Sequence, residues 1–318
     1  MAAKIIESEF KGAKSLIMEN DFLKVVILPY GGRVVSLYNK ANSREFLLQQ
    51  DSPAYTVDRY AGDYVGFNPC GFDDMFPTIN ECFYESYPWK GHVMPDHGEV
   101  WGLDWQYRIE DDRLIMDTYG IRLPYRLIKS FLFYDNGKKL HIDYAAENPT
   151  GFNMSFLWAA HPILKAEEGM EFYLPSCCTK AVSVLSAGIS DRIGGFGEEL
   201  DWPVAKDLKG VSHQLNKVRN SRMKIAEKYY FKNRLEEGWV RIKYPSDGAI
   251  LKLSFPPEKV PYLGILIDEG WWKDNLVYMI PEPCTAAFDS IALSKVYSMD
   301  SVIKSCSRYE WFLEFGFE

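Results

Sequence analysis

Apolar and polar residues alternate with a period of two along most of the chain, which is the pattern of a half-buried β-strand. The alternation is clearest where Leu140, Ile142, Tyr144 and Ala146 are separated by His, Asp and Ala residues. Further segments with strand character are 22–28, 33–38, 105–109, 114–119, 130–134, 152–158, 239–244, 249–255, 262–267, 276–280 and 302–317. The pattern therefore predicts a chain that is built mainly of β-strands.

Two turn signals join neighbouring strands into hairpins. Residues 135–137 read Asp-Asn-Gly, a strong hairpin signal because Asn and Gly tolerate positive φ values. An Asp-Gly pair at 247–248 links two further strands in the same way. Strands that follow one another without alternating helices predict an all-β fold, a large and mostly antiparallel sandwich with few short helices. Since no repeat or linker divides the chain, residues 1–318 are predicted to form a single domain.

Helical periodicity is scarce. We expect a charged surface helix within 214–229 and a short helix within 285–296. Two long stretches, 51–102 and 186–208, follow neither period, and the first is dense in Gly, Pro, Asp and aromatic residues. Loops of such length in a compact domain are usually functional or disordered, and the first is too aromatic to be disordered. We therefore expect it to contribute to a functional site.

Composition narrows the classes of partner. The formal net charge of -8 argues against nucleic acid and against an anionic membrane, because both reward a basic surface. The N-terminal residues lack an apolar signal region, and every apolar run ends well before the roughly 18 residues that span a bilayer. The six cysteines lack zinc-finger spacing. The simplest interpretation is a cytoplasmic protein with reduced thiols. Composition leaves a monomer and a homodimer equally open.

Glu282 lies between Pro281 and Pro283, directly after the apolar run 276–280. Each proline ring fixes its own φ, and the second biases Glu282 toward an extended backbone. A surface glutamate gains little from such rigidity, whereas a general base must be held in one geometry. The alternative is a solvated glutamate in a turn at the end of the strand.

Two histidines lie in similarly constrained settings. His97 is flanked by Asp96 and Glu99, and Gly98 allows the backbone to approach a ligand closely. His161 precedes a proline and ends an apolar strand, which predicts a position at the edge of a sheet surface. Taken alone, the first could cap a turn and the second could be a core histidine with one hydrogen bond. The three sites together call for a joint explanation.

The three sites occur in the order of the motifs of the aldose 1-epimerase, or galactose mutarotase-like, superfamily, which the chain resembles along its length. The matching segments are 22–29, the Gly-rich turn at 31–37, Phe-Pro at 76–77, His-Gly at 97–98, 148–162 and 281–285. The resemblance implies the galactose mutarotase-like supersandwich, with Glu282 as base, His161 as acid and His97 as a second donor. It also implies that neither a metal nor an organic cofactor is required.

The chain departs from the family at its sugar-binding positions. Trp101 stands near the place of an Arg that follows the family's His-Gly pair, and Arg59 is the nearest cation upstream of that loop. The family's substrate-binding Asp has no clear equivalent, and the corresponding region is 228–233. The residues that we predict to bind the sugar, as hydroxyl acceptors, stacking faces or cations, are Asp74, Asp96, Glu99, Trp101, Trp158, Arg33 and Arg59.

Interconversion of α- and β-anomers requires that a hemiacetal ring opens and recloses. One group removes the proton of the anomeric hydroxyl while another protonates the ring oxygen, and such assistance is typically worth ~100 to 10,000-fold. The sequence therefore predicts an isomerase, an aldose 1-epimerase that acts on a hexose by general acid–base catalysis. The roles must be able to swap, because the reaction is close to thermoneutral.

Several alternatives remain open from the sequence. A hexose-6-phosphate 1-epimerase would use the same pair but needs clustered cations, which Arg33, Arg59, Arg122 and Arg126 could supply. A non-catalytic carbohydrate-binding protein would need aromatic faces but not a base. A metal site at His92, Asp96 and His97 matches no standard spacing. A glycosidase or polysaccharide lyase is disfavoured because no second catalytic carboxylate is evident.

Overall fold

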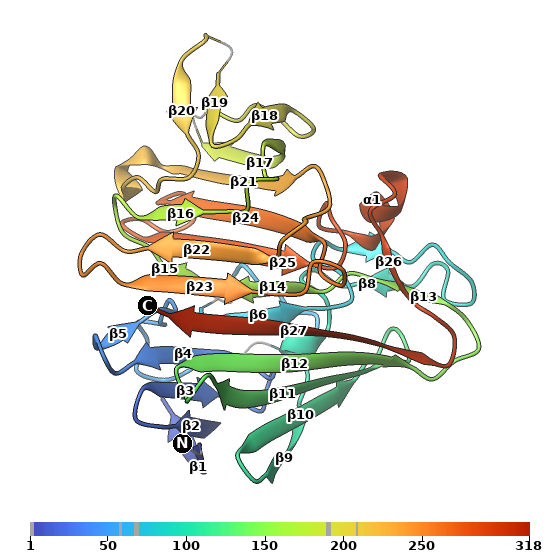
Figure 1. Ribbon diagram of the computed structural model, residues 1–318. Helices are drawn as coiled ribbons and strands as arrows, with labels where there is room; N and C mark the ends of the chain where they lie inside the picture. Colours follow the sequence, from blue (N-terminus) through green and yellow to red (C-terminus); the bar gives the residue numbers. More distant parts are fainter. Residues whose placement is uncertain (1–2, 57–58, 67–69, 189–191, 208) are drawn as a thin grey trace.

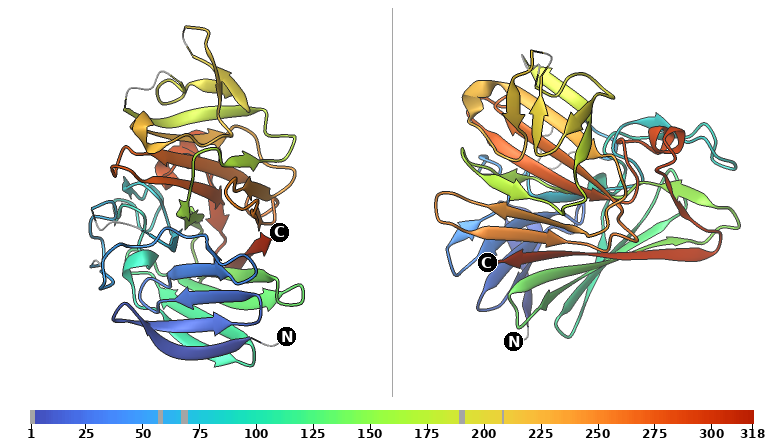
Figure 2. Two further views of the ribbon diagram at one scale, coloured as in Figure 1. Left: turned by 90° about the vertical axis from the view of Figure 1, so that its left-hand side faces the viewer. Right: turned by 45° about the horizontal axis from the view of Figure 1, so that its top comes forward.

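The computed structural model describes residues 3–56, 59–66, 70–188, 192–207 and 209–318. These residues form an all-β sandwich, in which the described strands build one 13-stranded sheet, one 8-stranded sheet and three small two-stranded sheets. Neighbouring strands of the two large sheets pair antiparallel. Figures 1 and 2 show the layers, with the 8-stranded sheet in front of the middle of the larger sheet in Figure 1. The predicted fold class is confirmed.

The larger sheet has the order β1-β2-β3-β4-β6-β14-β25-β24-β21-β17-β18, with β5 beside β4 and β15 beside β25. Its strands are β1 (Lys4–Phe10), β2 (Ala13–Glu19), β3 (Leu23–Ile27), β4 (Val34–Asn39), β5 (Arg44–Glu45), β6 (Phe72–Met75), β14 (Ala159–Pro162), β15 (Leu164–Lys165), β17 (Lys180–Gly188), β18 (Glu199–Asp201), β21 (Ile225–Phe231), β24 (Tyr262–Glu269) and β25 (Val277–Cys284).

The second sheet has the order β16-β22-β23-β27-β12-β11-β10-β9. Its strands are β9 (Gln106–Glu110), β10 (Arg113–Tyr119), β11 (Arg126–Tyr134), β12 (Lys139–Asn148), β16 (Glu171–Tyr173), β22 (Trp239–Lys243), β23 (Ile250–Ser254) and β27 (Ser307–Phe317). The remaining elements are the strand pairs β7 (Cys82–Phe83) with β8 (Val93–Met94), β13 (Met154–Phe156) with β26 (Ser301–Ile303) and β19 (Val204–Lys206) with β20 (Ser212–Gln214), the short helices η1 (Val100–Gly102) and η2 (Ser221–Met223), and the helix α1 (Ile291–Val296).

The core lies between the two large sheets, where the inward-facing residues of alternating strands meet. Phe72 of β6 contacts Phe315 of β27 across this layer, with ring centroids 5.6 Å apart. Lys129 of β11 also reaches across and binds Asp74 of β6 at 2.7 Å, and both side chains are almost fully buried. Because an unpaired buried charge is costly, each of these two charges stabilises the other in the core.

Both predicted hairpins are confirmed. β11 and β12 pair antiparallel around the turn at 135–137, where all three residues have positive φ values. β22 and β23 pair around the Asp-Gly turn, in which Gly248 has a φ of 73°. These turns close locally, so the dipeptide chemistry that predicts them is sufficient.

The helix predicted within 214–229 is wrong. The segment ends β20, forms the single turn η2 and then enters β21, a strand whose residues are all buried. β21 pairs with β17 on one side and with β24 on the other. Its charged residues suggested a solvated helix, but they are satisfied by ion pairs inside the protein, Glu227 with Arg192 and Lys228 with Glu282. Tertiary partners therefore override the local pattern.

Three further predictions are corrected in detail. The helix expected within 285–296 is restricted to α1, because Phe288 and Asp289 have positive φ values and the Ser290 hydroxyl caps the helix after them. The strand expected over 302–317 is divided into β26 and β27 by a turn. The stretches 51–102 and 186–208 are not free of regular structure. The first contains β6, β7 and β8, and the second contains the end of β17 and all of β18 and β19.

No helix within the described ranges is long and apolar enough to cross a membrane.

Candidate active site

Two of the three residues predicted to perform acid–base chemistry lie on adjacent strands in the middle of the larger sheet, and the third lies in a loop beside them. His161 comes from β14 and Glu282 from β25, its neighbour. His97 enters from the loop between β8 and η1. The His161 Nε2 atom is 4.0 Å from Oε1 of Glu282, and the ring centroids of His97 and His161 are 5.7 Å apart. The structure thus brings the three predicted residues together.

The two prolines of the Glu-Pro segment lie inside β25 and not in a turn after it. Pro281 and Pro283 face Ile265 and Leu263 of β24, and Glu282 faces Gly264. On the other edge of β25, β14 pairs only with Cys284, the last residue of β25. β15 pairs only with Tyr278 and Met279, near the start of β25. A residue without a backbone N–H is tolerated in such an interrupted ladder. The prolines therefore hold the strand extended where it lacks partners.

Gly264 makes room for the carboxylate side chain. A Cβ atom at this position would lie 3.1 Å from ring carbons of Tyr230 and 3.5 Å from Cβ of Glu282. The neighbour would have to shift by a few tenths of an ångström, since the packing of protein interiors leaves little free space. The absence of a side chain on β24 thus contributes to the placement of Glu282.

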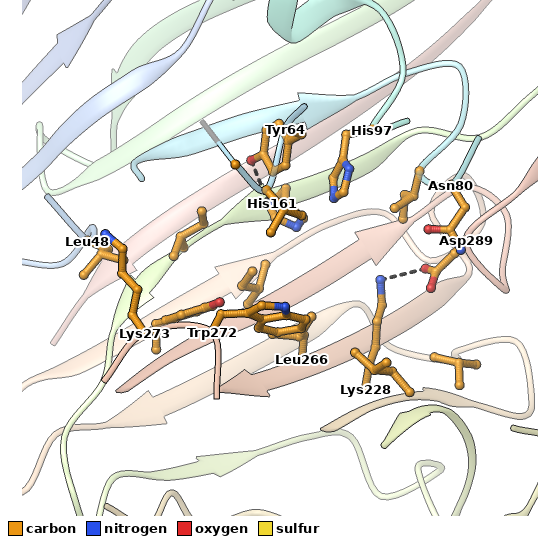
Figure 3. Close-up of a pocket in the computed structure, with 18 of the residues that line it drawn as sticks. Leu48, Tyr64, Asn80, His97, His161, Lys228, Leu266, Trp272, Lys273 and Asp289 are labelled. Carbon is orange, nitrogen blue, oxygen red and sulfur yellow. Dashed lines mark hydrogen bonds and ion pairs between the residues drawn. The ribbon is translucent and has the colours of Figure 1, made fainter. Parts of the chain in front are cut away.

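A cavity of about 360 Å³ lies over these strands, as Figure 3 shows. That volume is within the usual range for a small-molecule site. One end is polar and is lined by His97, His161, Asn80, Lys228 and Asp289. The opposite end is formed mainly by apolar side chains, among them Leu48, Ile163, Leu266, Leu276 and Ile280.

Glu282 is fully buried next to the polar end of the cavity but does not itself line it. Its Oε2 atom is 2.6 Å from Nζ of Lys228, which also lies 2.6 Å from Oδ1 of Asp289. Despite this short contact, neither oxygen of Glu282 accepts a hydrogen bond of ordinary geometry from a described residue. A buried carboxylate with free acceptor capacity beside a cavity is suited to receive a proton or a hydroxyl group.

Burial sets the protonation of this cluster. Burial raises the pKa of Glu282 to about 7, although the positive charge of Lys228 opposes the rise. Burial disfavours the charge of Lys228, but Asp289 and Glu282 outweigh it and raise its pKa. Burial, together with the neighbouring groups His97 and Lys228, lowers the pKa of His161 well below its usual value. Near neutral pH, His161 is therefore neutral and Glu282 is poised between its two forms.

The loop that carries His97 is held in one conformation. His97 has a φ of 58°, and its Nδ1 atom lies 2.7 Å from Oδ2 of Asp96. Its ring stacks on Tyr64, with centroids 4.1 Å apart. Gly98 is required for packing against the protein itself, since a Cβ atom there would lie 2.3 Å from the carbonyl oxygen of Phe76. Gly98 was expected to allow close approach of a ligand, but it allows close approach of the backbone at Phe76 instead.

None of the seven predicted sugar-binding residues is among the described residues that line this cavity. Asp74 binds Lys129 and the Nε1 atom of Trp158 at 2.9 Å in the core between the sheets. Glu99 is fully buried and accepts hydrogen bonds from the Tyr60 hydroxyl and from two backbone N–H groups. Trp101 also lies in the core.

The three others lie outside the cavity as well. Arg33 binds Asp73 at 2.5 Å and is buried. Asp96 is half-exposed and contacts His97, and Arg59 is exposed at the surface.

Sequence reasoning missed several polar groups that line the cavity, among them Lys228, Asp289, Tyr64 and Asn80. Lys228 falls at the start of the region 228–233, but the segment was predicted to be a helix. Asp289 follows the Glu-Pro segment, and its backbone oxygen accepts hydrogen bonds from Ile79 and Asn80. No local signal distinguishes Tyr64 or Asn80 from the other residues of their long loop.

The fold and the site define a large antiparallel β-sandwich with a buried carboxylate and two histidines beside one cavity. The sequence model of the aldose 1-epimerase family matches residues 14–179, just over half of the chain. The chain therefore belongs to the aldose 1-epimerase family. The matched part contains His97 and His161, whereas Glu282 follows it. Membership implies an epimerase or mutarotase kind of enzyme, an isomerase that acts on a small-molecule sugar.

Solved structures share the fold. The Slr1438 protein from Synechocystis sp. PCC 6803 is 15% identical with a TM-score of 0.69, over 98% of each chain. A galactose mutarotase-like protein from Clostridium acetobutylicum is 16% identical with a TM-score of 0.67, over 100% of this chain and 99% of that chain. One from Lactobacillus casei is 15% identical with a TM-score of 0.64, over 96% and 100%. At these identities the likeness concerns the fold. No curated protein matches this chain in sequence.

Proposed function

We propose that the protein is an aldose 1-epimerase that interconverts the α- and β-anomers of a neutral aldose by general acid–base catalysis. The observation that carries this proposal is the pair formed by Glu282 and His161, two buried ionisable groups 4.0 Å apart beside a cavity. At this separation a substrate oxygen can come within hydrogen-bond reach of both, about 2.6–3.2 Å from each. The pair is supported by family membership, which concerns the same kind of reaction.

Ring opening needs one proton acceptor and one proton donor on the same sugar. In the free enzyme the single proton of the pair rests on Glu282, and it passes to Nε2 of His161 when the sugar binds. The carboxylate of Glu282 then removes the proton of the anomeric hydroxyl, and the imidazolium of His161 protonates the ring oxygen. His97, whose ring lies across from His161, serves as a second donor to that oxygen. Reclosure from the other face runs the transfer backwards, so the pair needs one proton that either member can hold. Coupled groups of this kind titrate as a pair.

Glu282 has to gain contact with the sugar, because Lys228 and His161 lie between its carboxylate group and the polar end of the cavity. The Oε1 atom of Glu282 faces His161, and this oxygen accepts no hydrogen bond from a described residue. We expect the anomeric hydroxyl to bind at this oxygen. A small displacement of Lys228, which keeps Asp289 as a partner, would open the approach.

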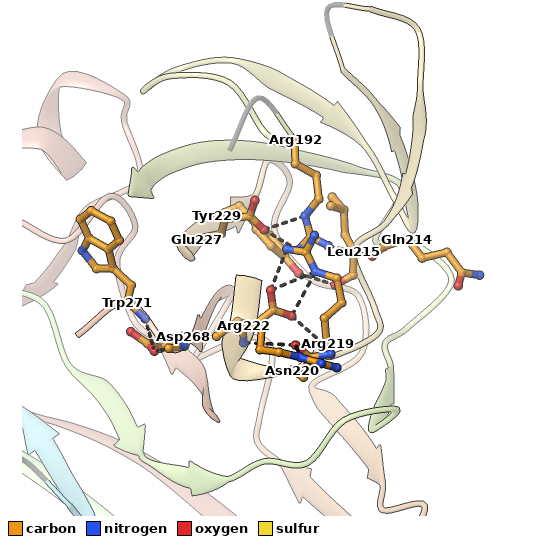
Figure 4. Close-up of polar contacts among 12 residues, drawn as sticks. Arg192, Gln214, Leu215, Arg219, Asn220, Arg222, Glu227, Tyr229, Asp268 and Trp271 are labelled. Carbon is orange, nitrogen blue, oxygen red and sulfur yellow. Dashed lines mark hydrogen bonds and ion pairs between the residues drawn. The ribbon is translucent and has the colours of Figure 1, made fainter. Parts of the chain in front are cut away.

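The charges around the cavity favour a neutral sugar over a sugar phosphate. Phosphate recognition usually relies on convergent arginines. Here Arg33 pairs with Asp73 in the core and Arg126 pairs with Asp117 on the other sheet. Beside the larger sheet, Arg192 binds Glu227 of β21, and Arg219 binds Glu269 of β24. Figure 4 shows Arg192 next to Glu227, with Arg219 close by.

The two lysines among the described residues that line the cavity also offer little positive charge to a phosphate group. Lys228 is paired with two carboxylates, and Lys273 is exposed at the apolar end. A phosphate group bound at the apolar end of the cavity would therefore meet one exposed ammonium group and an otherwise apolar wall. Burial of a dianion with so little compensation is costly.

Exchange spectroscopy tests the activity and the substrate class together. Equilibrated glucose, galactose and their 6-phosphates are mixed with the protein, and magnetisation transfer between the anomers is compared with buffer. We expect faster exchange for a neutral hexose than for its 6-phosphate. Faster exchange of the phosphate would support the hexose-6-phosphate epimerase instead. If no sugar exchanges faster than in buffer, the protein is a carbohydrate-binding member of the fold, which the same sugars test by titration.

The exchange rate is expected to fall as the pH rises through about 7. Above this pH Glu282 loses its proton while His161 is already neutral, so the pair keeps an acceptor but has no donor. Lys228 and Asp289 also face Glu282 and help to set this midpoint. Polarimetry of kcat/KM against pH checks the result, since that ratio reports the free enzyme. A rate that rises through pH 7 would show that ionised Glu282 acts with a donor outside the pair, such as His97.

A further inference from the structure

The Tyr64 hydroxyl lies between a carboxylate and the imidazole of His161. It donates a hydrogen bond to Oδ2 of Asp73 at 3.0 Å, and its oxygen is 3.3 Å from Nδ1 of His161. The other carboxylate oxygen of Asp73 binds the guanidinium group of Arg33 at 2.5 Å. All four side chains are at least nine-tenths buried, so bulk water does not compete for these contacts. Figure 3 shows Tyr64 directed at His161 on the wall of the cavity.

The hydroxyl has a single proton, and two acceptors compete for it. Asp73 carries a full negative charge in its pair with Arg33, and hydrogen bonds to a charged acceptor are roughly twice as strong as neutral ones. Burial raises the pKa of Tyr64 well above its usual value, so the proton stays on the phenol. The proton is therefore directed at Asp73, and the Tyr64 oxygen presents a lone pair to His161.

A lone pair on the Tyr64 oxygen determines which ring nitrogen of His161 is protonated. If Nδ1 were bare, two acceptors would face each other at 3.3 Å in the interior, which is unfavourable. If Nδ1 carries a hydrogen, it donates to the Tyr64 oxygen and completes the chain. A neutral imidazole has only one N–H, so its Nε2 atom is then an acceptor. Nε2 is the atom that faces Glu282.

We propose that Tyr64, held by Asp73 and Arg33, is a positioning residue that keeps a proton on Nδ1 of His161. Nε2 is then the only atom of this ring that gains or loses a proton during turnover. The catalytic consequence rests on the proposed function, whereas the tautomer itself does not. The arrangement follows a general rule for histidine, in which the hydrogen bond of one nitrogen sets the role of the other.

These linked hydrogen bonds explain why a single proton is transferred in a defined direction. Without a partner at Nδ1, the ring could place its hydrogen on either nitrogen. A hydrogen on Nε2 would leave no acceptor facing Glu282, and neutral His161 could not take up the proton that Glu282 holds. Tyr64 also contacts His97 by stacking, a contact that does not need the hydroxyl group. The Tyr64→Phe variant therefore removes the hydrogen bond to Nδ1 of His161 but retains the ring.

The wild-type protein tests the tautomer directly. Long-range proton–nitrogen NMR spectra distinguish a pyrrole-like nitrogen from a pyridine-like nitrogen, and the resonances of His161 are assigned by comparison with a His161→Asn variant. We expect a pyrrole-like Nδ1 and a pyridine-like Nε2 at pH 7. The reverse pattern would overturn the proposal. This measurement needs no sugar, so its outcome is independent of whether anomer exchange is found.

The variant tests the role of the hydroxyl. In Tyr64→Phe we expect the His161 hydrogen to move to Nε2 or to divide between the nitrogens, with kcat lower by roughly 10- to 100-fold, as for other small errors of positioning. KM should change much less. Tyr60→Phe is the matched control, because it also removes a hydroxyl bonded to a buried carboxylate, Glu99, outside the cavity. A Tyr64→Phe spectrum identical to the wild type would contradict the proposal, and so would an equal loss of kcat in the control.

Discussion

Anomer exchange is expected to fall by roughly 100-fold or more in the Glu282→Gln variant, the usual contribution of a positioned acid–base group. Glutamine keeps the shape of the side chain but cannot accept and return a proton. Sugar affinity should change far less, because the amide can still form a hydrogen bond with a hydroxyl group. Exchange spectroscopy and sugar titration on the same sample separate the two effects.

Stability is expected to hold or rise slightly in the same variant. The pKa of Glu282 is raised from 4.5 to about 7 in the folded protein, so ionisation of this group reduces stability as the pH rises from about 4.5 through 7. Removal of the carboxylate relieves this cost, and the gain should be largest above pH 7. Lys228 retains Asp289 as its partner. Urea unfolding at pH 6 and pH 8 measures the difference.

Glu227→Gln is a matched control for Glu282→Gln. Glu227 is also a buried carboxylate of the larger sheet, but it pairs with Arg192 and not with a group of the cavity. Its replacement should reduce stability and leave the exchange rate per folded molecule close to the wild type. Full exchange activity in Glu282→Gln would remove this residue from the mechanism. A Glu282→Gln protein that merely unfolds would indicate a structural anchor of β25.

The Lys228→Met variant is expected to lose about 3–5 kcal/mol of stability, the typical cost when one partner of a buried ion pair is removed. Methionine fills much of the space of the lysine stem but leaves Glu282 and Asp289 without the cation that both contact at 2.6 Å. Lys228 lowers the pKa of Glu282, so its loss should raise that pKa above 7. The loss of stability should therefore be smaller at low pH and grow as the pH rises through the new pKa.

The exchange rate gives a second measurement for this variant. Because the pair would keep its proton to a higher pH, the alkaline fall of the rate should move upward with the pKa of Glu282. Lys273→Met is the control, since Lys273 also lines the cavity but is exposed, and a surface substitution should change stability by no more than about 0.5 kcal/mol. An unchanged pH profile in Lys228→Met would contradict the coupling of Lys228 to Glu282.

The most predictable parts of the molecule depend on neighbours in the chain. The strand at 140–146 and the hairpin at 135–137 follow from alternation and from backbone preferences of a few residues, and both are present as expected. His161 and Glu282 stood out because Pro restricts the backbone beside each of them, and His97 stood out because Gly98 permits a backbone conformation that other residues rarely adopt. The structure brings these three together, but their catalytic roles stay a prediction.

The least predictable parts depend on partners that are distant in the chain. Asp74 looked like a candidate to bind a hydroxyl group, yet Lys129 and Trp158 occupy it from 55 and 84 residues away. Lys228 looked like part of a solvated helix. Only the register of β21 on β24, together with that of β24 on β25, places Lys228 against Glu282. In each case a charged residue that was expected to face solvent or substrate is instead buried in an ion pair. A short stretch of sequence does not show whether a residue is buried.

The sequence by itself determined the strand-rich class of the fold, its local hairpins and the rigid backbone beside Glu282, because these features depend on short-range sterics and on the period of the side chains. Only the tertiary structure decided which charges face the cavity. The Lys228–Asp289 pair, the Tyr64 contact to His161 and the raised pKa of Glu282 all arise when distant segments exclude water from the same small volume. Electrostatic energies there depend on distance and burial, which the fold sets and no local pattern encodes.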